Sequence, residues 1–204
     1  MNEDEIDQIL DQIFTLDLQD LKQKIPNWFA KGNIRKSVAI VEAFRAIEDT
    51  DQNLTRSLNN LAQVHHDQGR YDEAKPLYVQ ALEIRRKALG EDHPYYATSL
   101  NNLASLYHAQ GRYDAAEPLY VQALEIAREA LGADHPDYAG SLNNLGVLYV
   151  AQGRLDEAAP MLQQALAIWE KALPADHPDT QSTREWLDHL YAERPDLRDG
   201  AEMS

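Results

Sequence analysis

The sequence repeats itself every 42 residues, and this repetition restricts the fold more than any other feature of the chain. The string Ser-Leu-Asn-Asn-Leu-Ala at residues 57–62 returns at 99–104, and with a final glycine at 141–146. Gln-Gly-Arg and Asp-His-Pro strings recur at the same interval. Units 57–98 and 99–140 are identical at 31 of 42 positions, which excludes coincidence. A period of this length predicts a repeat architecture in which each unit packs on its neighbours.

Each unit predicts two helices. The apolar residues between Leu58 and His65 recur at i, i+3, i+4 and i+7, which is the pattern of one helical face. Gly69 supplies the left-handed conformation that a helix end favours, and Asp72 is expected to cap the second helix. Gly90 is expected to end that helix, and Pro94 suits the first turn of the next one. No stretch alternates with period two, so we expect no sheet.

These strings resemble the tetratricopeptide repeat, in the long 42-residue form found in kinesin light chains. The matching pattern is S-L-N-N-L-A-x-L-Y-x-x-Q-G-R-Y-D-x-A-x-P-L-Y-x-Q-A-L-x-I followed by L-G-x-D-H-P, and it covers about residues 55–191. The resemblance implies an all-α fold, a right-handed α-solenoid of antiparallel helix pairs with capping helices at both ends. It also implies a scaffold for binding other proteins rather than one particular function. Because the chain has few repeats and no long heptad region, we do not expect a kinesin subunit.

The ends of the chain depart from the repeat and predict caps. Apolar residues between Ile6 and Leu21 follow helical spacing, which predicts a helix over about residues 3–24 that closes the core or, alternatively, binds a partner or a second copy. Pro195 is expected to end the last helix and leave 196–204 as a frayed acidic tail. The expected partition is 1–31 N-terminal capping helix, 32–54 degenerate half repeat ending in a second helix over 32–49, 55–181 three repeats, and 182–204 C-terminal capping helix and tail.

No group of residues in the sequence predicts catalysis, so we do not expect an enzyme. His93, His135 and His177 occur once per repeat, each before a proline at a helix start, where an N-cap is wanted. Their expected spacing of about 10 Å is too large for a shared zinc ion. We therefore expect no metal ion and no cofactor. The acidic pairs Asp72/Glu73 and Asp156/Glu157 suit the positive end of a helix dipole.

Each repeat also carries a Gly-Arg turn, at Arg70, Arg112 and Arg154. One arginine per turn admits two interpretations, an anion-binding site or a surface ion pair. Because acidic residues stand two positions later, at 72, 114 and 156, we expect the ion pair.

The net charge of the chain limits the classes of partner that we expect. Acidic residues number 34 and basic residues 19, for a net charge of −15 and a pI near 4.7. This balance argues against nucleic acids and anionic membrane surfaces, which bind basic faces. Cysteine is absent, no apolar run is long enough to span a membrane, and the first residues are acidic, so we expect a cytoplasmic protein.

The resemblance also implies which residues would line a concave groove. These are the outward positions of the first helices, with only one charged residue among them. In sequence order they are Arg56, Asn59, Asn60, Gln63 and His66, then Thr98, Asn101, Asn102, Ser105 and His108, then Gly140, Asn143, Asn144, Val147 and Val150.

The asparagine pairs are the most distinctive groove residues. Asparagine is a mediocre helix former, so three pairs inside helices need an offsetting role. One interpretation is contact with a bound peptide backbone, at least by Asn60, Asn102 and Asn144. The other is a ladder of hydrogen bonds between neighbouring first helices.

The expected function is a non-catalytic scaffold that binds a short extended segment of a protein partner. The groove grades from polar to apolar toward Val147 and Val150. Its length suits six to nine extended residues, at about 10 Å between helices and about 3.3 Å per residue. We therefore expect a largely uncharged peptide. The alternative is a structural homo-oligomer, such as a homodimer, assembled through the N-terminal helix or the C-terminal cap.

Overall fold

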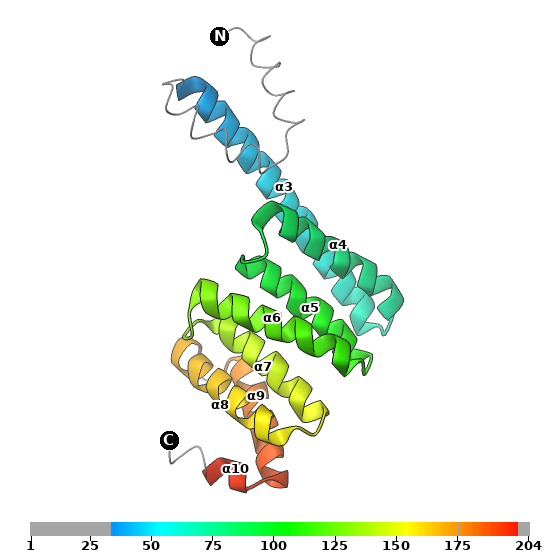
Figure 1. Cartoon of the computed structure of the whole chain (residues 1–204), viewed down its shortest axis with the longest axis vertical. Helices are drawn as coiled ribbons and strands as arrows, with labels where there is room; N and C mark the ends of the chain where they lie inside the picture. The colour runs from blue at the N-terminus through cyan, green and yellow to red at the C-terminus, as the bar shows by residue number, and fades with distance from the viewer. Residues whose placement is uncertain (1–33, 175, 200–204) are drawn as a thin grey trace. The chain divides into compact units, whose positions relative to one another are not determined.

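The computed structural model describes the backbone of residues 34–174 and 176–199, and the side chains of residues 51–174 and 176–198. The predicted helix over 3–24, and the rest of segment 1–31, lie outside the described residues. The chain divides into two compact units, 1–56 and 57–204. The described helices are α3 (Ile34–Asp67), α4 (Tyr71–Leu89), α5 (Pro94–Ala109), α6 (Tyr113–Leu131), α7 (Pro136–Ala151), α8 (Leu155–Ala172), α9 (Pro178–Glu193) and α10 (Asp196–Asp199) (Figure 1).

The second unit is a stack of helix pairs, as the repeat predicts. Neighbouring helices along the chain pack on one another from α4 to α9 (Figure 1). A complete unit consists of a 16-residue first helix such as α5, a tight turn, a 19-residue second helix such as α6 and a short connection. The described residues contain no strand. Among these helices, none combines the length and the apolar character that crossing a membrane would require.

Several helices begin or end at the residues predicted from the sequence. The His93 Nδ1 accepts a hydrogen bond from the Tyr95 backbone N–H at 3.1 Å, with Pro94 at the first helical position. His135 and His177 cap α7 and α9 in the same way, as expected. The turn at Gly69 has φ = 70°, the left-handed conformation that glycine tolerates best.

Two local predictions about helix boundaries were wrong. Asp72 does not cap α4, because the helix begins one residue earlier, at Tyr71, and its N-cap is Arg70 without a side-chain bond. Asp72 instead lies in the first turn, where it still favours the helix dipole. The predicted helix over 32–49 does not end there, since α3 continues to Asp67. Where later units have Asp-His-Pro, this one has Thr50-Asp51-Gln52, so no proline interrupts the helix.

The C-terminal end also differs from the prediction. Residues 196–199 form the short helix α10 instead of belonging to a frayed tail. Arg194 holds this end in place, because its guanidinium bonds both Asp156 on α8 and Asp196 on α10. The predicted last cap helix is present as α9, which buries Leu187 and Leu190.

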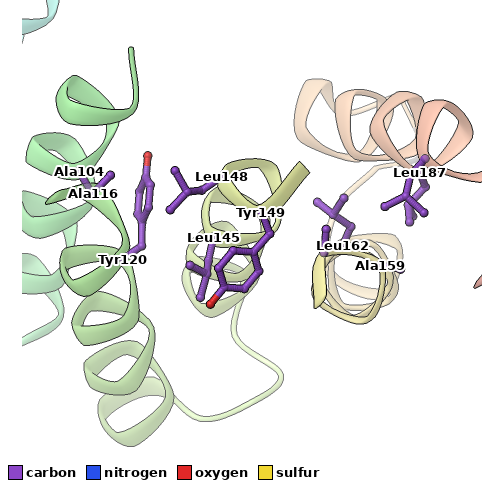
Figure 2. Close-up of a cluster of buried hydrophobic side chains, with 11 residues drawn as sticks. Ala104, Ala116, Tyr120, Leu145, Leu148, Tyr149, Ala159, Leu162 and Leu187 are labelled. Atoms are coloured by element: carbon purple, nitrogen blue, oxygen red, sulfur yellow. The ribbon is translucent and has the colours of Figure 1, made fainter. Parts of the chain in front are cut away.

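The core of the second unit is built from small and large residues that alternate between neighbouring helices. One cluster joins Tyr120 of α6, Leu145 and Leu148 of α7, and Leu162 of α8, all 2 % exposed or less (Figure 2). The small residues Ala62 and Ala104, at equivalent places in successive repeats, are fully buried, and Gly146 of the third repeat is buried too. A Cβ built on Gly146 would lie 2.9 Å from the Leu162 side chain, so α7 and α8 approach too closely there for alanine.

The same core positions are open at the start of the second unit. Leu61 and Val64 of α3 are each 49 % exposed. Their counterparts one repeat later, Leu103 and Leu106, are 6 % and 0 % exposed. The first repeat therefore presents an apolar face that the following repeats bury.

Candidate functional site

The first asparagine of each pair forms a ladder between neighbouring first helices. The Asn101 Nδ2 donates to the Ser141 Oγ at 3.0 Å, which links α5 to α7. One step along, the Thr183 Oγ1 donates to the Asn143 Oδ1 at 2.9 Å, which links α7 to α9. Helix α3 joins the ladder through Asn59, whose Oδ1 accepts from Asn102 at 3.4 Å. The interpretation of the pairs as a ladder therefore holds for Asn59, Asn101 and Asn143, and for Asn102 as the donor to Asn59.

The second asparagine of each pair is placed differently. Asn60 is exposed and Asn144 is half-buried, and within the described part of the chain neither side-chain amide makes a hydrogen bond. Asn102 makes only the long bond to Asn59. Two of the three amides that we expect to contact a peptide are therefore unoccupied, and peptide contact by them stays a prediction.

The remaining predicted groove residues fall into two groups. The polar ones bond within the fold: the Gln63 Oε1 accepts from the Tyr78 hydroxyl at 2.9 Å, and Ser105 shares a hydrogen bond with Tyr120. The apolar residues Val147 and Val150 are half-buried at the edge of the core cluster.

The two histidines and the one arginine of the predicted groove also have neighbours. His66 packs on Tyr71 and His108 on Tyr113, each with ring centroids 5.6 Å apart. Burial lowers the pKa of His108 below the usual value for histidine. Arg56 donates to the Asn53 Oδ1 at 2.8 Å, within α3.

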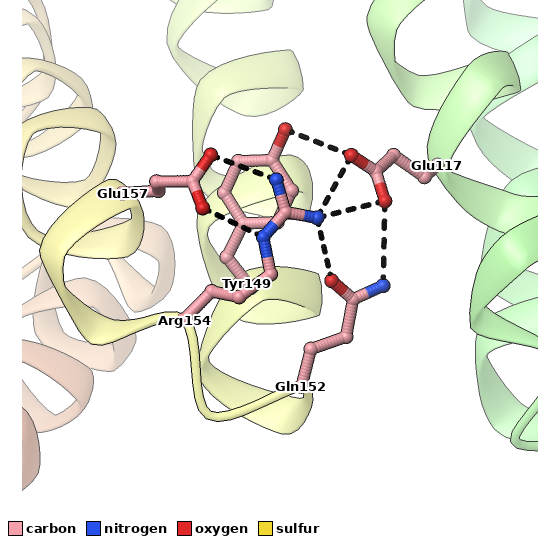
Figure 3. Close-up of polar contacts among 5 residues, drawn as sticks. All are labelled: Glu117, Tyr149, Gln152, Arg154 and Glu157. Atoms are coloured by element: carbon pink, nitrogen blue, oxygen red, sulfur yellow. Dashed lines mark hydrogen bonds and ion pairs between the residues drawn. The ribbon is translucent and has the colours of Figure 1, made fainter.

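The structure adds a polar site that the sequence did not reveal, a carboxylate network at the contact of the second and third repeats (Figure 3). The Glu117 carboxylate of α6 accepts two hydrogen bonds from Arg154, at 2.9 and 2.8 Å. It also accepts from the Tyr149 hydroxyl at 3.2 Å and from the Gln152 Nε2 at 3.4 Å. The Arg154 guanidinium stacks over the Tyr149 ring at 3.9 Å and bonds Glu157 at 2.7 Å.

This carboxylate network holds its acid in the charged form. The hydrogen bonds from Arg154, with smaller contributions from Gln152 and Tyr149, lower the pKa of Glu117 despite its partial burial. Because Glu117 and Arg154 are 37 residues apart, no short motif could reveal their contact. The network ties α6 to the turn before α8.

The ion pairs predicted at the Gly-Arg turns form with other partners or not at all. Arg70 lies 3.6 Å from Glu73, and Arg154 pairs with Glu117 and Glu157, so Asp72 and Asp156 are not the partners. In the described part of the chain, Arg112 makes no ion pair. Ion pairs thus form at Arg70 and Arg154, but with acids other than those predicted, and Asp156 is instead bonded by Arg194.

A pocket of about 280 Å³ lies between α8 and α9. Leu166, Leu187 and Tyr191 form its apolar wall, and Glu170 and Arg184 form an ion pair at its rim. None of the predicted groove residues lines it. Across residues 51–174 and 176–198, no three histidine, aspartate or glutamate side chains gather closely enough to hold a metal ion.

Comparison with known proteins places the repeats in a family. The profile of the family described as Tetratricopeptide repeat matches residues 53–129 and 97–171, together more than half of the chain. A 47-residue stretch, 23% of the chain, is 45% identical to a nucleotide-binding leucine-rich repeat (NLR)-like protein from Hyaloscypha variabilis, and spans only 5% of that protein's length.

Solved structures show the same architecture. The Podosopora anserina protein of nearly identical TPR-like repeats, assigned to kinesin light chains, superposes with a TM-score of 0.64 and 31% identity, over 72% of this chain and 70% of that one. BtubC (BKLC) from P. vanneervenii has a TM-score of 0.64 and 27% identity, over 89% and 74% of the two chains. The chain belongs to the tetratricopeptide repeat family, and its repeats are of the kinesin light chain-like type.

Proposed function

We propose that the chain is a non-catalytic scaffold that binds a short, extended segment of a protein partner along its first helices. The observation that supports this function is that the asparagines of the first helices make different contacts. Asn101 and Asn143 bond the next first helix, whereas the amides of Asn60 and Asn144 make no hydrogen bond to any described residue. Neither of these two amides is therefore used to join the described helices.

The chemistry of these free amides suits a peptide backbone. A carboxamide donates and accepts hydrogen bonds, so it can pair with a backbone N–H and C=O whatever the peptide side chains are. First helices spaced by about 10 Å would place successive asparagines three peptide residues apart, at about 3.3 Å per residue. Val147 and Val150, half-buried beside Asn144, favour an apolar side chain at that end of the peptide.

A selection for peptides tests this proposal without a known partner. A displayed library of random nine-residue peptides would be panned against the chain, and the affinity of the selected peptides measured by isothermal titration calorimetry. We expect the triple variant Asn60→Ala/Asn102→Ala/Asn144→Ala to weaken binding by about tenfold or more, since each lost hydrogen bond contributes about 0.5–1.5 kcal/mol.

A matched control removes amides at the same 42-residue spacing from the second helices. Gln80, Gln122 and Gln164 occupy equivalent positions in α4, α6 and α8, and no hydrogen bond joins their side chains to the described residues. We expect their replacement by alanine to leave affinity unchanged. Equal effects of the two triple variants, or no effect of the asparagine variant, would reject the groove.

A homo-oligomer is the second candidate, and the exposed face of the first repeat supports it. Leu61 and Val64 leave about half of their surface in solvent where later repeats bury the same positions. If this face joins two copies, Leu61→Asp should convert a concentration-independent dimer to a monomer in light scattering, and deletion of 1–31 would show whether that segment takes part. A monomeric wild-type chain would exclude this candidate. The cytoplasmic location stays a prediction.

A further inference from the structure

The donors of the carboxylate network occur twice in the molecule, but their acceptor occurs once. Tyr107, Gln110 and Arg112 stand 42 residues before the tyrosine, glutamine and arginine that hold Glu117. They belong to the same places in the repeat, at the end of α5 and in the turn that follows. On α4, however, the place of the glutamate is taken by Lys75. The contact of the first and second repeats therefore has every donor of the network, with a lysine in the place of the accepting glutamate.

These donors already have part of the arrangement seen in the network. The Arg112 guanidinium stacks over the Tyr107 ring at 4.5 Å, as its counterpart in the third repeat does at 3.9 Å. The Lys75 ammonium lies 5.4 Å from the same ring. Within the described residues, no carboxylate lies within 4.0 Å of Arg112 or Lys75, and the Tyr107 hydroxyl makes no hydrogen bond.

Gln110 gives an independent sign that a partner is missing. Its Oε1 is buried without any hydrogen bond among the described residues, which is unfavourable for a polar atom. In the network, the equivalent Oε1 of Gln152 accepts from Arg154 at 2.8 Å. That arginine is drawn into position by the carboxylate on its other side. Bringing a carboxylate to Arg112 would satisfy the Gln110 oxygen in the same way.

The positive charge of the proposed site comes from Arg112 and Lys75, which share the Tyr107 ring. Gln110 also borders a pocket of about 250 Å³, which is otherwise lined by residues 69–73 of the preceding turn and not by Arg112, Lys75 or Tyr107. Of the two acids in that turn, Glu73 is engaged by Arg70 at 3.6 Å and by the His65 Nδ1 at 3.3 Å, whereas Asp72 is exposed. Two cations sharing one aromatic ring attract an anion more strongly than either does alone.

We propose that Tyr107, Gln110 and Arg112, together with Lys75, bind the carboxylate of an acidic side chain on a protein partner. Arg112 donates to the carboxylate oxygens, Lys75 adds the second positive charge, and the Tyr107 hydroxyl and the Gln110 amide complete the set of donors. This site rests on the proposed scaffold function, because the carboxylate comes from a bound partner. The site lies at the turns and not among the predicted groove residues, so it would bind a second part of that partner.

A short acidic peptide tests the site directly. Acetyl-Gly-Glu-Gly-amide would be titrated into the full chain while the Arg112 Nε–H and Gln110 side-chain amide signals are followed by NMR, with acetyl-Gly-Gln-Gly-amide at equal ionic strength as the control. We expect saturable shifts with the glutamate peptide and roughly fivefold weaker binding of the glutamine peptide. Equal responses to both peptides would overturn the proposal.

Two variants of the chain sharpen the result. Lys75→Glu should place a carboxylate of the chain itself beside Arg112, as Glu117 does beside Arg154, and abolish the response at Arg112. Glu117→Lys combined with Glu157→Ala, which removes the other acid that Arg154 bonds and copies Ala115 of the second repeat, should open the second site and create the same response at Arg154. A response that persists in Lys75→Glu would overturn the proposal, as would this double variant if it is folded by circular dichroism but silent.

Two further measurements distinguish this site from the proposed groove and identify the source of the carboxylate. The triple asparagine variant should leave the tripeptide response unchanged, so failure of the groove and failure of this site are distinguishable. Sedimentation of the wild-type chain and of Lys75→Glu tests for self-association. Association that disappears in Lys75→Glu would assign the carboxylate to a second copy of the chain and overturn the assignment to a partner.

Discussion

Replacing Gly146 by alanine should destabilise the chain although alanine is the better helix former. A Cβ at this position would lie 2.9 Å from both Cγ and Cδ2 of Leu162, which is fully buried. The substitution gains about 1 kcal/mol of helix propensity. It loses about 1–3 kcal/mol because the branch point of a packed leucine must move. We expect the free energy of unfolding to fall by about 1 kcal/mol.

Urea denaturation followed by circular dichroism measures this loss, and Ala104→Gly in α5 serves as the matched control. Ala104 occupies the same place in the preceding repeat and is fully buried beside Tyr120. Its replacement by glycine loses helix propensity and a packed methyl group, about 2 kcal/mol in total. Opposite substitutions at equivalent positions should therefore both destabilise. A Gly146→Ala variant that gains about 1 kcal/mol would refute the packing argument.

A transplant of the neighbouring residues should relieve the loss. In the second repeat, Ala104 faces a tyrosine whose hydroxyl is bonded by Ser105. The third repeat changes all three positions together, to Gly146, Val147 and Leu162. Adding Val147→Ser and Leu162→Tyr to Gly146→Ala should recover about 1 kcal/mol relative to the sum of the single changes. Strict additivity of the three changes would show that these positions do not act as a packing unit.

Three further outcomes follow from the structure. Leu103→Ala should lower the free energy of unfolding by about 2–4 kcal/mol and Leu61→Ala by less than about 1, because their side chains are 6 % and 49 % exposed; equal losses in urea titration would contradict this comparison. Glu117→Gln should lower the free energy of unfolding by about 0.5–1 kcal/mol at pH 7. Because Arg154 lowers the pKa of Glu117, the stabilisation by the Glu117 carboxylate is present above the pKa of the unfolded state and disappears as pH falls through the pKa of the folded state. A difference between wild type and variant that is the same at pH 3 as at pH 7 would contradict this. Gly111→Ala should cost about 1–2 kcal/mol through its φ of 70° alone, since a Cβ there meets nothing within 4 Å, and an unchanged midpoint of thermal unfolding would disprove it.

Local chemistry explains which parts of the fold could be predicted. Helix ends at Gly69 and His93 follow from one residue's backbone conformation or one side-chain bond, so a single sequence reveals them. The predicted cap at Asp72 lies two residues beyond the observed N-cap, Arg70, because acids favour both the cap and the first turn. We expected a new first helix to begin near residue 55, as it does in the later repeats. Residues 50–52 lack the Asp-His-Pro string that starts those helices, so α3 continues without a break.

Contacts between repeats could be predicted only in part. Spacing placed each asparagine pair on the first helices, but it could not tell that Asn101 bonds the next helix while Asn144 bonds none of the residues that the structure describes. The partner of Arg154 was predicted as Asp156, whereas Arg154 bonds Glu157, three residues on, and Glu117, 37 residues away. Such choices depend on side-chain geometry across a junction, which a repeating pattern leaves undetermined.

The difference between Lys75 and Glu117 also has a consequence for how the chain folds. Units that share 31 of 42 residues can dock out of order, since nearly the same surface is offered by more than one neighbour. If α4 instead of α6 docked on α7, Lys75 would stand in the place of Glu117, and Arg154 would lose that carboxylate. When α6 docks on α7, the same arginine finds a carboxylate. The few positions at which the repeats differ thus favour one order of assembly, and a Lys75→Glu chain should refold with more misassembled intermediates.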